Sequence, residues 1–320
     1  MKTRRKHIVL FFATCVLHTL IFSQNQPLFD QYHFNQLVLN PAYAGSKGNV
    51  EANLFYRQQW TKMDGAPESI SGTVHMNAAN DKLGMGLKIL QESIGATNKL
   101  QLGLQYAYRI HVSNTGVLAL GIDVSATNYQ LNFQELTAYQ VGDPAFIYQP
   151  ENTWSPNVGA GIWFNTNKIF AGISSPVILE DTISGVNNDD ISQLNIFEAG
   201  RHYYFSAGIL IGNIETFAIK PYTLVKYAPD APVQVDASLS FIFKNNFWLG
   251  GSYRTNSSIS LMGQYFLKRK ETTRENNFGI GYAYNMRIDE FQNYFGPSHE
   301  IFGTWQFNKK QTKYTNPRFF

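Results

Sequence analysis

The sequence predicts an all-β fold, an antiparallel transmembrane β-barrel of about 14 strands that follows a short non-periodic N-terminal segment. Three observations lead to this prediction: polar and apolar residues alternate along most of the chain, the first residues have the pattern of an export signal, and charged residues are few. Only 15% of the 320 residues are charged, whereas soluble domains average about 25%. The net charge of +3 is too small for a basic nucleic-acid-binding protein, so we expect no nucleic-acid partner.

Residues 1–23 are predicted to be a secretory signal peptide that is removed. Four basic residues open the chain, an apolar run follows at residues 8–22, and Ser23 provides a small residue at the expected cleavage point. Removal takes away these four basic residues and no acidic ones, so the net charge falls from +3 to −1. A retained membrane anchor and a lipoprotein cleaved at Cys15 are the alternatives. Because Cys15 is the only cysteine, a disulfide scaffold and a cysteine-based zinc site are excluded.

Strand alternation begins near Val50 and continues to about Asn308. In residues 100–110, Leu, Tyr and Ile side chains share one face, and Gln, Gly, Ala and Arg side chains share the other. Most such segments approach the ~9–11 residues that a tilted strand needs to cross a bilayer. They begin near Val50, Ser69, Leu83, Lys99, Val117, Asn157, Ile169, Arg201, Thr216, Val233, Asn246, Ser258, Asn276 and Ser298.

We therefore divide the chain into a signal peptide (1–23), a turn-rich lead segment (24–49), a β-barrel (50–308) and a C-terminal tail (309–320). The long polar connections are expected at residues 132–154 and 176–200. No later segment approaches the ~20 apolar residues of a transmembrane helix.

A soluble periplasmic β protein would also show alternation, but three features favour a lipid environment. Aromatic residues gather near the strand ends, as in the girdles of outer-membrane barrels. The polar face of the strands is rich in Gly and Ala, which keeps a small lumen packable. Nine charged strand residues fall on that polar face, which lines the lumen of a barrel: Arg57, Lys88, Arg109, Asp123, Lys220, Lys226, Asp236, Arg254 and Arg287.

Several motifs give the chain a resemblance to a known family. They are Gln31-Tyr32, Asn35, Asn40-Pro41-Ala42-Tyr43-Ala44-Gly45, Tyr56-Arg57-Gln58-Gln59-Trp60, Gly65-x-Pro67, Tyr203-Tyr204, Gly250-x-x-Tyr253-Arg254 and Ser298-His299-Glu300-Ile301. In this order and over essentially the whole exported chain, they resemble the PorP/SprF family, outer-membrane proteins associated with the type IX secretion system of Bacteroidetes. The two N-terminal motifs are specific, whereas the glycine-aromatic strand patterns are not.

The resemblance implies an outer-membrane barrel that supports secretion, surface anchoring or display of a large exported adhesin, with a link to gliding motility in some relatives. It implies outer-membrane lipid, an exported surface adhesin and components of the secretion machine as partners. The motif residues with a possible structural or partner-binding role are Gln31, Tyr32, Asn35, Asn40, Pro41, Ala42, Tyr43, Ala44, Gly45, Tyr56, Arg57, Gln58, Trp60, Gly65, Pro67, Arg254, His299 and Glu300.

Two details of the site remain open from sequence. The lead segment either plugs the lumen or lines its mouth, or it is only a locally ordered entry into the first strand. Arg57 either pairs with Glu92 or Asp123 across the lumen or stays solvated.

We expect no catalytic, cofactor-binding or metal-ligating residues, and therefore not an enzyme. The sequence lacks an H-E-x-x-H zinc motif and a G-x-S-x-G nucleophile elbow. A passive porin or solute channel is the alternative function, because the charged polar face alone is equally typical of an open pore.

Overall fold

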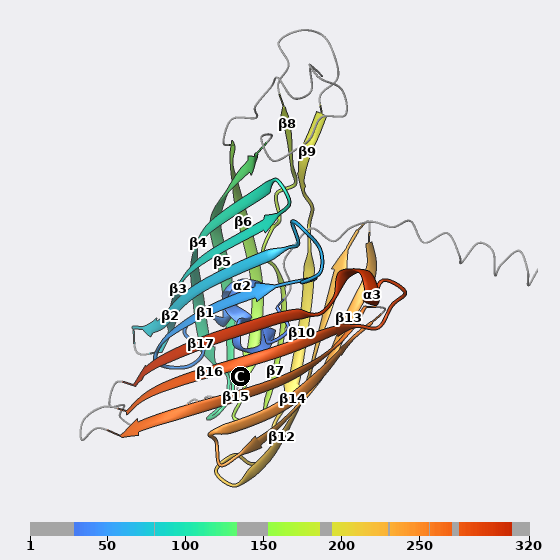
Figure 1. Cartoon of the computed structure of the whole chain (residues 1–320). Coiled ribbons are helices and arrows are strands. Elements are labelled where there is room, and N and C mark those ends of the chain that lie inside the picture. The colour runs from blue at the N-terminus through green and yellow to red at the C-terminus, as the bar shows by residue number, and fades with distance from the viewer. Residues whose placement is uncertain are drawn as a thin grey trace, which may run out of the picture.

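The computed structural model describes residues 29–79, 81–132, 153–185, 194–229, 231–255, 257–270 and 275–308. Within these ranges, antiparallel strands form one wall around a filled lumen (Figure 1). The wall consists of β1 (Val50–Gln58), β2 (Glu68–Ala78), β3 (Leu83–Ile94), β4 (Thr97–His111), β5 (Val117–Leu131), β6 (Thr153–Asn165), β7 (Ile169–Ser175), β10 (Tyr203–Ile209), β11 (Ile211–Asn213), β12 (Phe217–Ala228), β13 (Ala231–Phe243), β14 (Phe247–Arg254), β15 (Ser258–Lys270), β16 (Glu275–Arg287) and β17 (Ser298–Asn308).

The wall closes on itself at two places. β1 pairs with both β2 and β17, which joins the first strand to the last. β10 pairs with both β7 and β12, which joins the two halves of the chain. β11 follows β10 after Leu210 and pairs with the same neighbour, β12, so the two strands occupy one position. The described wall therefore has fourteen strand positions, which confirms the predicted barrel.

One hairpin outside the wall was not predicted. β8 (Asp181–Gly185) and β9 (Leu194–Ala199) pair only with each other, inside the stretch that we expected to be a long polar connection. Figure 1 shows this hairpin extending beyond the end of the wall. Its strands have only five and six residues, too short for a pattern that is sought over the ~9–11 residues of a spanning strand. The start of β6, Thr153, also lies four residues before the predicted Asn157.

The connections divide the barrel into two unlike ends. The four longest connections, residues 59–67, 132–152, 176–202 and 288–297, all lie at one end, which we call the long-loop end. At the other end, which we call the short-turn end, the connections have at most five residues. β1 begins and β17 ends at the short-turn end. This asymmetry is typical of outer-membrane barrels.

The two faces of the wall have the reverse of a soluble protein's polarity. Apolar side chains point outward, and Leu54, Leu104 and Leu261 are 61%, 62% and 57% exposed. Charged side chains point into the lumen, where Lys88 and Asp123 are buried. An apolar exterior with charges inside is stable only when hydrocarbon surrounds the wall, because water around it would leave this apolar surface unburied.

The lead segment occupies the lumen, and every residue from Phe29 to Gly48 is buried. It folds into three short helical turns, η1 (Tyr32–Phe34), α2 (Gln36–Leu39) and η2 (Pro41–Tyr43). Asn40 begins the last turn, because its side-chain oxygen accepts a hydrogen bond from the Ala42 N–H at 2.9 Å. Pro41 suits the first position of this turn, where no backbone N–H is required.

Glycines of three wall strands form a seat for residues 40–45. A side-chain carbon added at Gly84, Gly121 or Gly161 would overlap the lead segment, at Ala44, Ala42 and Asn40 respectively. Gly45 completes the seat from the lead side: its φ of +72° belongs to the left-handed region, and an added carbon would lie 2.8 Å from the Gly84 Cα. Gly84, Gly121 and Gly161 are therefore contact points for the lead segment.

This seat predicts that a glycine-to-alanine substitution lowers stability on the inner face of the wall and has little effect on the outer face. Gly121→Ala places a carbon against the backbone of Ala42, so we expect a loss of about 1–3 kcal/mol in the free energy of unfolding. Gly72→Ala is the matched control, because nothing lies within 4 Å of the added carbon, and we expect a change within about 0.5 kcal/mol. Denaturant unfolding of the barrel in lipid vesicles measures both. Equal losses for the two variants would contradict the seat.

Candidate functional site

The structure brings the lead motif and three wall residues of the predicted set together inside the lumen. All nine predicted residues between Gln31 and Gly45 are buried there. Arg57, Arg254 and Glu300 line the lumen from three strands and converge on Asp30 at the start of the described chain. The remaining predicted residues, Tyr56, Gln58, Trp60, Gly65, Pro67 and His299, lie outside this group.

Five charged side chains form what we call the rim cluster: Asp30, Arg57, Asp236, Arg254 and Glu300. The Asp30 carboxylate contacts Arg57 at 2.6 Å and Arg254 at 3.6 Å. Arg57 also reaches Glu300 at 3.2 Å. Arg254 donates to both oxygens of Asp236, with N···O distances of 2.9 to 3.1 Å. The cluster therefore joins the lead segment to β1, β14 and β17, and through Arg254 to β13, by ion pairs and charge-assisted hydrogen bonds.

Glu300 holds the lead backbone directly. Its two carboxylate oxygens accept hydrogen bonds from the N–H groups of Asp30 and Gln31, at 2.6 and 2.9 Å. The Gln31 side-chain oxygen accepts a further bond from Gln264 at 3.0 Å, and Asn285 donates to the Asp30 carboxylate at 3.0 Å. Because these groups are buried, removal of one partner would leave a charge unpaired in a medium that solvates it poorly.

The rim cluster lies at the long-loop end of the barrel. Arg57 is the last residue but one of β1, and Arg254 is the last residue of β14. Asn285 lies two residues before the end of β16, and Glu300 lies two residues after the start of β17. All four strands thus contribute their residues from within two positions of the same end.

A second charged group, the base cluster, joins the lead segment to the wall at the short-turn end. It consists of Lys47, Glu51, His75 and Gln306. Lys47 lies 3.8 Å from the Glu51 carboxylate, and the His75 Nε2 lies 3.5 Å from it. The Gly45 N–H donates to the His75 Nδ1 at 3.2 Å, and Gln306 donates to Glu51. The lead segment therefore spans the lumen, with one ionic attachment near each end.

Between the clusters, wall side chains bond the carbonyl groups of the lead segment. Gln105 donates to the Leu37 carbonyl and Ser174 donates to the Leu39 carbonyl, both at 2.8 Å. In the reverse direction, the Asn40 side-chain amide donates to the Ile162 carbonyl at 3.0 Å. The bonds to Leu37 and Leu39 satisfy backbone carbonyls that short helical turns leave without partners.

Aromatic rings pack the remaining space of the lumen. Phe34 of the lead segment stacks on Phe302 of β17 with ring centroids 4.8 Å apart, and Phe302 stacks on Phe55 of β1 at 5.2 Å. On the opposite wall, Tyr43 meets Trp163 edge to face at 5.2 Å. Such pairs add about 0.5–1.5 kcal/mol each to the burial of their area. The lead segment is thus a packed plug, which answers the question that the sequence left open.

The partners that we considered for Arg57 were wrong. Arg57 pairs with Asp30 and Glu300, whereas Asp123 pairs with Lys88 at 2.9 Å and Glu92 lies 3.8 Å from Lys99. The reason is register. Arg57 and Glu300 face each other directly on adjacent strands, whereas Asp123 lies four strands away along the wall.

Three of the other six predicted residues, Trp60, Gly65 and Pro67, belong to the loop of residues 59–67 at the long-loop end. Together with the neighbouring loop of residues 288–297 it forms what we call the loop platform. Trp60 packs on Phe295 with ring centroids 5.0 Å apart, and the Arg287 guanidinium lies over both rings. The Thr61 N–H donates to the Pro297 carbonyl at 3.0 Å. Trp60 has a φ of +51°, a strained conformation for an aromatic residue, which these contacts hold in place.

The loop platform exposes large apolar side chains. Tyr294 is 76% exposed, Phe291 53% and Met63 45%. Beside them, the Arg287 guanidinium bonds the Asp289 carboxylate and lowers the pKa of Asp289. Several large apolar side chains exposed on one pair of loops are typical of an interaction site.

Four predicted residues have only local roles near this end. The Pro67 carbonyl accepts from the Gln59 N–H at 2.9 Å, and the Gly65 carbonyl accepts from the Gly95 N–H at 2.8 Å. His299 bonds the Tyr282 hydroxyl at 2.6 Å, and the Gln58 side chain reaches Glu68 at 3.5 Å. Tyr56 points outward and is 39% exposed.

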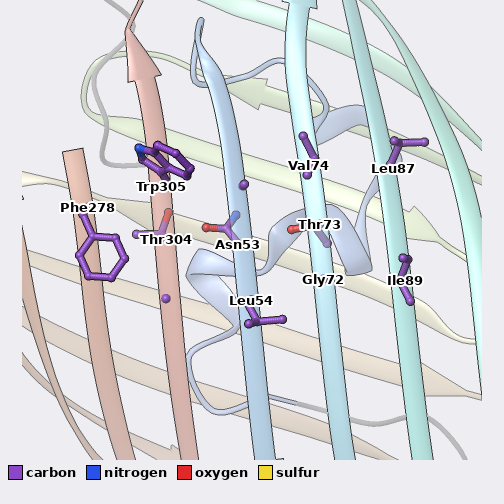
Figure 2. A pocket seen from close by; sticks show the side chains of 12 residues that line it. Asn53, Leu54, Gly72, Thr73, Val74, Leu87, Ile89, Phe278, Thr304 and Trp305 are labelled. Carbon is purple, nitrogen blue, oxygen red and sulfur yellow. The ribbon is translucent and has the colours of Figure 1, made fainter. Parts of the chain in front are cut away.

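The outer wall has an apolar hollow of about 540 Å³ over β16, β17, β1, β2 and β3 (Figure 2). It arises because Gly72 and Gly303 are the outward-facing neighbours of Leu54 on the two adjoining strands. Leu54, Val74, Leu87 and Ile89 line it, and the plug lies on the other side of the strands (Figure 2). The hollow lies on the outer face of the wall.

The described ranges contain no group of three or more His, Asp or Glu side chains arranged to hold a metal ion. No helix in these ranges is long and apolar enough to cross a membrane.

Several residues that hold the plug were not predicted from the sequence. Asp30, Lys47, Glu51 and His75 were not among the candidates, although they supply the ionic attachments of the lead segment. One signal was present: Asp30 is the only acidic residue and Lys47 the only lysine or arginine between residues 24 and 49. Isolated charges in an apolar, aromatic segment need partners when they are buried.

A closed antiparallel wall with an apolar exterior, a charged lumen and unequal ends defines an outer-membrane β-barrel. The family described as "Type IX secretion system membrane protein PorP/SprF" matches residues 21–305. The chain therefore belongs to the PorP/SprF family, as its motifs indicated.

Solved structures of other barrels are similar in overall shape. The monoaromatic hydrocarbon channel CymD has a TM-score of 0.48 at 12% identity, covering 91% of this chain and 95% of that one. The toluene transporter TbuX of Ralstonia pickettii has a TM-score of 0.49 at 11% identity, covering 86% and 93%. The toluene transporter TodX of Pseudomonas putida has a TM-score of 0.46 at 10% identity, covering 88% and 95%. No curated protein matches the sequence.

The geometry at Glu300 predicts that its charge and its two acceptor oxygens hold the plug. In Glu300→Gln, one of the two backbone N–H groups loses its acceptor and Arg57 loses a carboxylate, so we expect a loss of about 3–5 kcal/mol in stability. Hydrogen exchange at the amides of Asp30 and Gln31 measures the local effect. Glu180→Gln is the matched control, because Glu180 pairs with Arg201 at the surface, and its loss is expected to stay below about 1 kcal/mol. Unchanged protection of both amides in Glu300→Gln would refute this role.

Proposed function

We propose that this protein is a non-enzymatic accessory barrel of the type IX secretion system, which supports the secretion, surface anchoring or display of a large exported adhesin. Membership of the PorP/SprF family supports the link to the secretion machine and to the membrane. The proposal extends this link to an exported adhesin as the partner. The proposal also includes two expectations from the sequence. Residues 1–23 are removed during export, and the protein acts in the outer membrane.

The filled lumen is the observation that favours a scaffold over a passive porin. A porin needs a continuous aqueous path, whereas this lumen holds twenty buried residues of the lead segment, from Phe29 to Gly48. Ionic clusters hold that segment near both ends, and stacked rings pack it in between. A barrel whose lumen is closed in this way is suited to hold other molecules on its outer surfaces.

The two ends of the barrel suggest where a surface partner binds. Long loops of outer-membrane barrels face the cell exterior and short turns face the periplasm. We therefore assign the long-loop end to the cell surface. The loop platform then presents Phe291 and Tyr294 outward, beside the Arg287–Asp289 pair. Large aromatic side chains on a fixed platform are typical anchors of protein interfaces.

The first test is electrical. In planar bilayers, the unmodified barrel is expected to show no steady conductance, because the plug fills the lumen. Gly121→Val, which drives a branched side chain into the backbone of Ala42, is expected to produce openings. Gly72→Val is the control and should remain silent, since its side chain points away from the lumen. A steady open conductance of the unmodified protein would instead support the porin.

The second test concerns the partner. Deletion of the gene is expected to remove the adhesin from the cell surface, and the unmodified gene should restore it. Restoration with Phe291→Ala and Tyr294→Ala combined is expected to give about tenfold less surface adhesin, the effect of losing roughly 1.4 kcal/mol of binding.

Phe247→Ala controls for the loss of an exposed aromatic residue, because Phe247 begins β14 at the short-turn end. Its surface adhesin should match that of the unmodified barrel, with equal amounts of both barrels in the membrane. Normal display of every exported adhesin in the deletion strain would eliminate the proposed function.

A further inference from the structure

The path of the lead segment has a direction that fixes the position of the chain's first residues. The segment joins β1 at the short-turn end, where Gly45 and Lys47 contact the base cluster. Followed from β1 toward lower residue numbers, the segment passes through the lumen and reaches the rim cluster at Asp30. The described chain therefore starts at the end of the barrel opposite to the start of β1.

We infer that the plug is threaded outward and that the exported chain begins on the cell-surface side of the outer membrane. Asp30 is bonded to residues within two positions of the long-loop ends of β1, β14, β16 and β17. Five residues, 24–28, separate Phe29 from the proposed cleavage point. Fully extended, they span roughly 17 Å, enough to carry the new N-terminus from the rim cluster beyond the mouth.

The bonds of Asp30 also oppose a retreat of residues 24–28 toward the periplasm. To return, the segment would have to draw the Asp30 carboxylate away from Arg57 and Arg254 and past the ring of Phe302. The segment enters from the short-turn end, since it is continuous with β1 there. The apolar run of residues 8–22 would have to pass through the same lumen, so removal of the signal peptide precedes threading.

The test uses single cysteines, because Cys15 leaves with the signal peptide and the exported chain has no other. Asn25→Cys marks the N-terminus, Asp64→Cys marks the loop platform, and Asn114→Cys marks a turn at the short-turn end. Asp64 and Asn114 are both exposed. Intact cells are treated with a membrane-impermeant maleimide, and heat-modifiable gel mobility verifies that each variant is folded.

We expect Asn25→Cys and Asp64→Cys to be labelled to a similar extent in intact cells, and Asn114→Cys only after permeabilisation. Adding Gly121→Val to Asn25→Cys, to displace the plug, should lower its surface labelling several-fold while Asp64→Cys with the same change stays labelled. Protection of Asn25→Cys alongside labelling of Asp64→Cys would overturn the inference. Labelling of Asn114→Cys and protection of Asp64→Cys would overturn the assigned orientation and the inference with it.

These outcomes are independent of the adhesin. The side on which the N-terminus lies depends on the proposed orientation of the barrel, which the Asp64 and Asn114 variants measure directly. Surface labelling of Asn25→Cys, together with normal adhesin display in the deletion strain, would therefore refute the proposed function while leaving the threaded plug standing.

Discussion

The structure follows from one constraint, that a backbone surrounded by hydrocarbon must bond its N–H and C=O groups within the protein. A sheet satisfies this condition only when it has no free edge. The double pairing of β10 with β7 and β12, and of β1 with β2 and β17, removes the edges of the described wall. Closure then forces the side chains into two groups, with Leu54 and its outward neighbours in lipid and Arg57 and its inward neighbours in the lumen.

Closure also creates a space that this chain fills with its own lead segment. Buried charges are costly when they lack partners, so the lead segment and the wall must be complementary. Each of the two charged residues between 24 and 49, Asp30 and Lys47, meets opposite charges of the wall. Such pairs add little net stability, yet a segment shifted by one residue would leave them unpaired. Their main effect is to fix the position of the plug.

The wall was predictable from sequence because its physics is local. Side chains alternate between two solvents with a period of two, and that signal survives in each strand separately. The hairpin of β8 and β9 escaped prediction because it does not cross the membrane and its strands are too short to show the pattern. The partners of Arg57 escaped it because a charge on the inward face can meet any other inward charge until register and closure are known.

The plug was only half predictable, for a related reason. The motif of residues 40–45 marked a turn-rich segment, but the glycines that receive it, Gly84, Gly121 and Gly161, are spread over three strands. In the sequence, each looks like an ordinary strand glycine, and the presence of a glycine in a strand has several explanations. Their common contact with the lead segment can be recognised only when the folded wall brings them to one side of the lumen.

The attachments of the plug at its two ends differ in kind. At the short-turn end, the covalent chain continues into β1 and the base cluster adds to it. At the long-loop end, only hydrogen bonds and ion pairs hold Asp30. If Asp30 leaves the rim cluster, Arg57 and Arg254 lose a carboxylate in a poorly solvated place. Because that loss costs several kcal/mol, the rim cluster opposes the departure of the plug from the lumen.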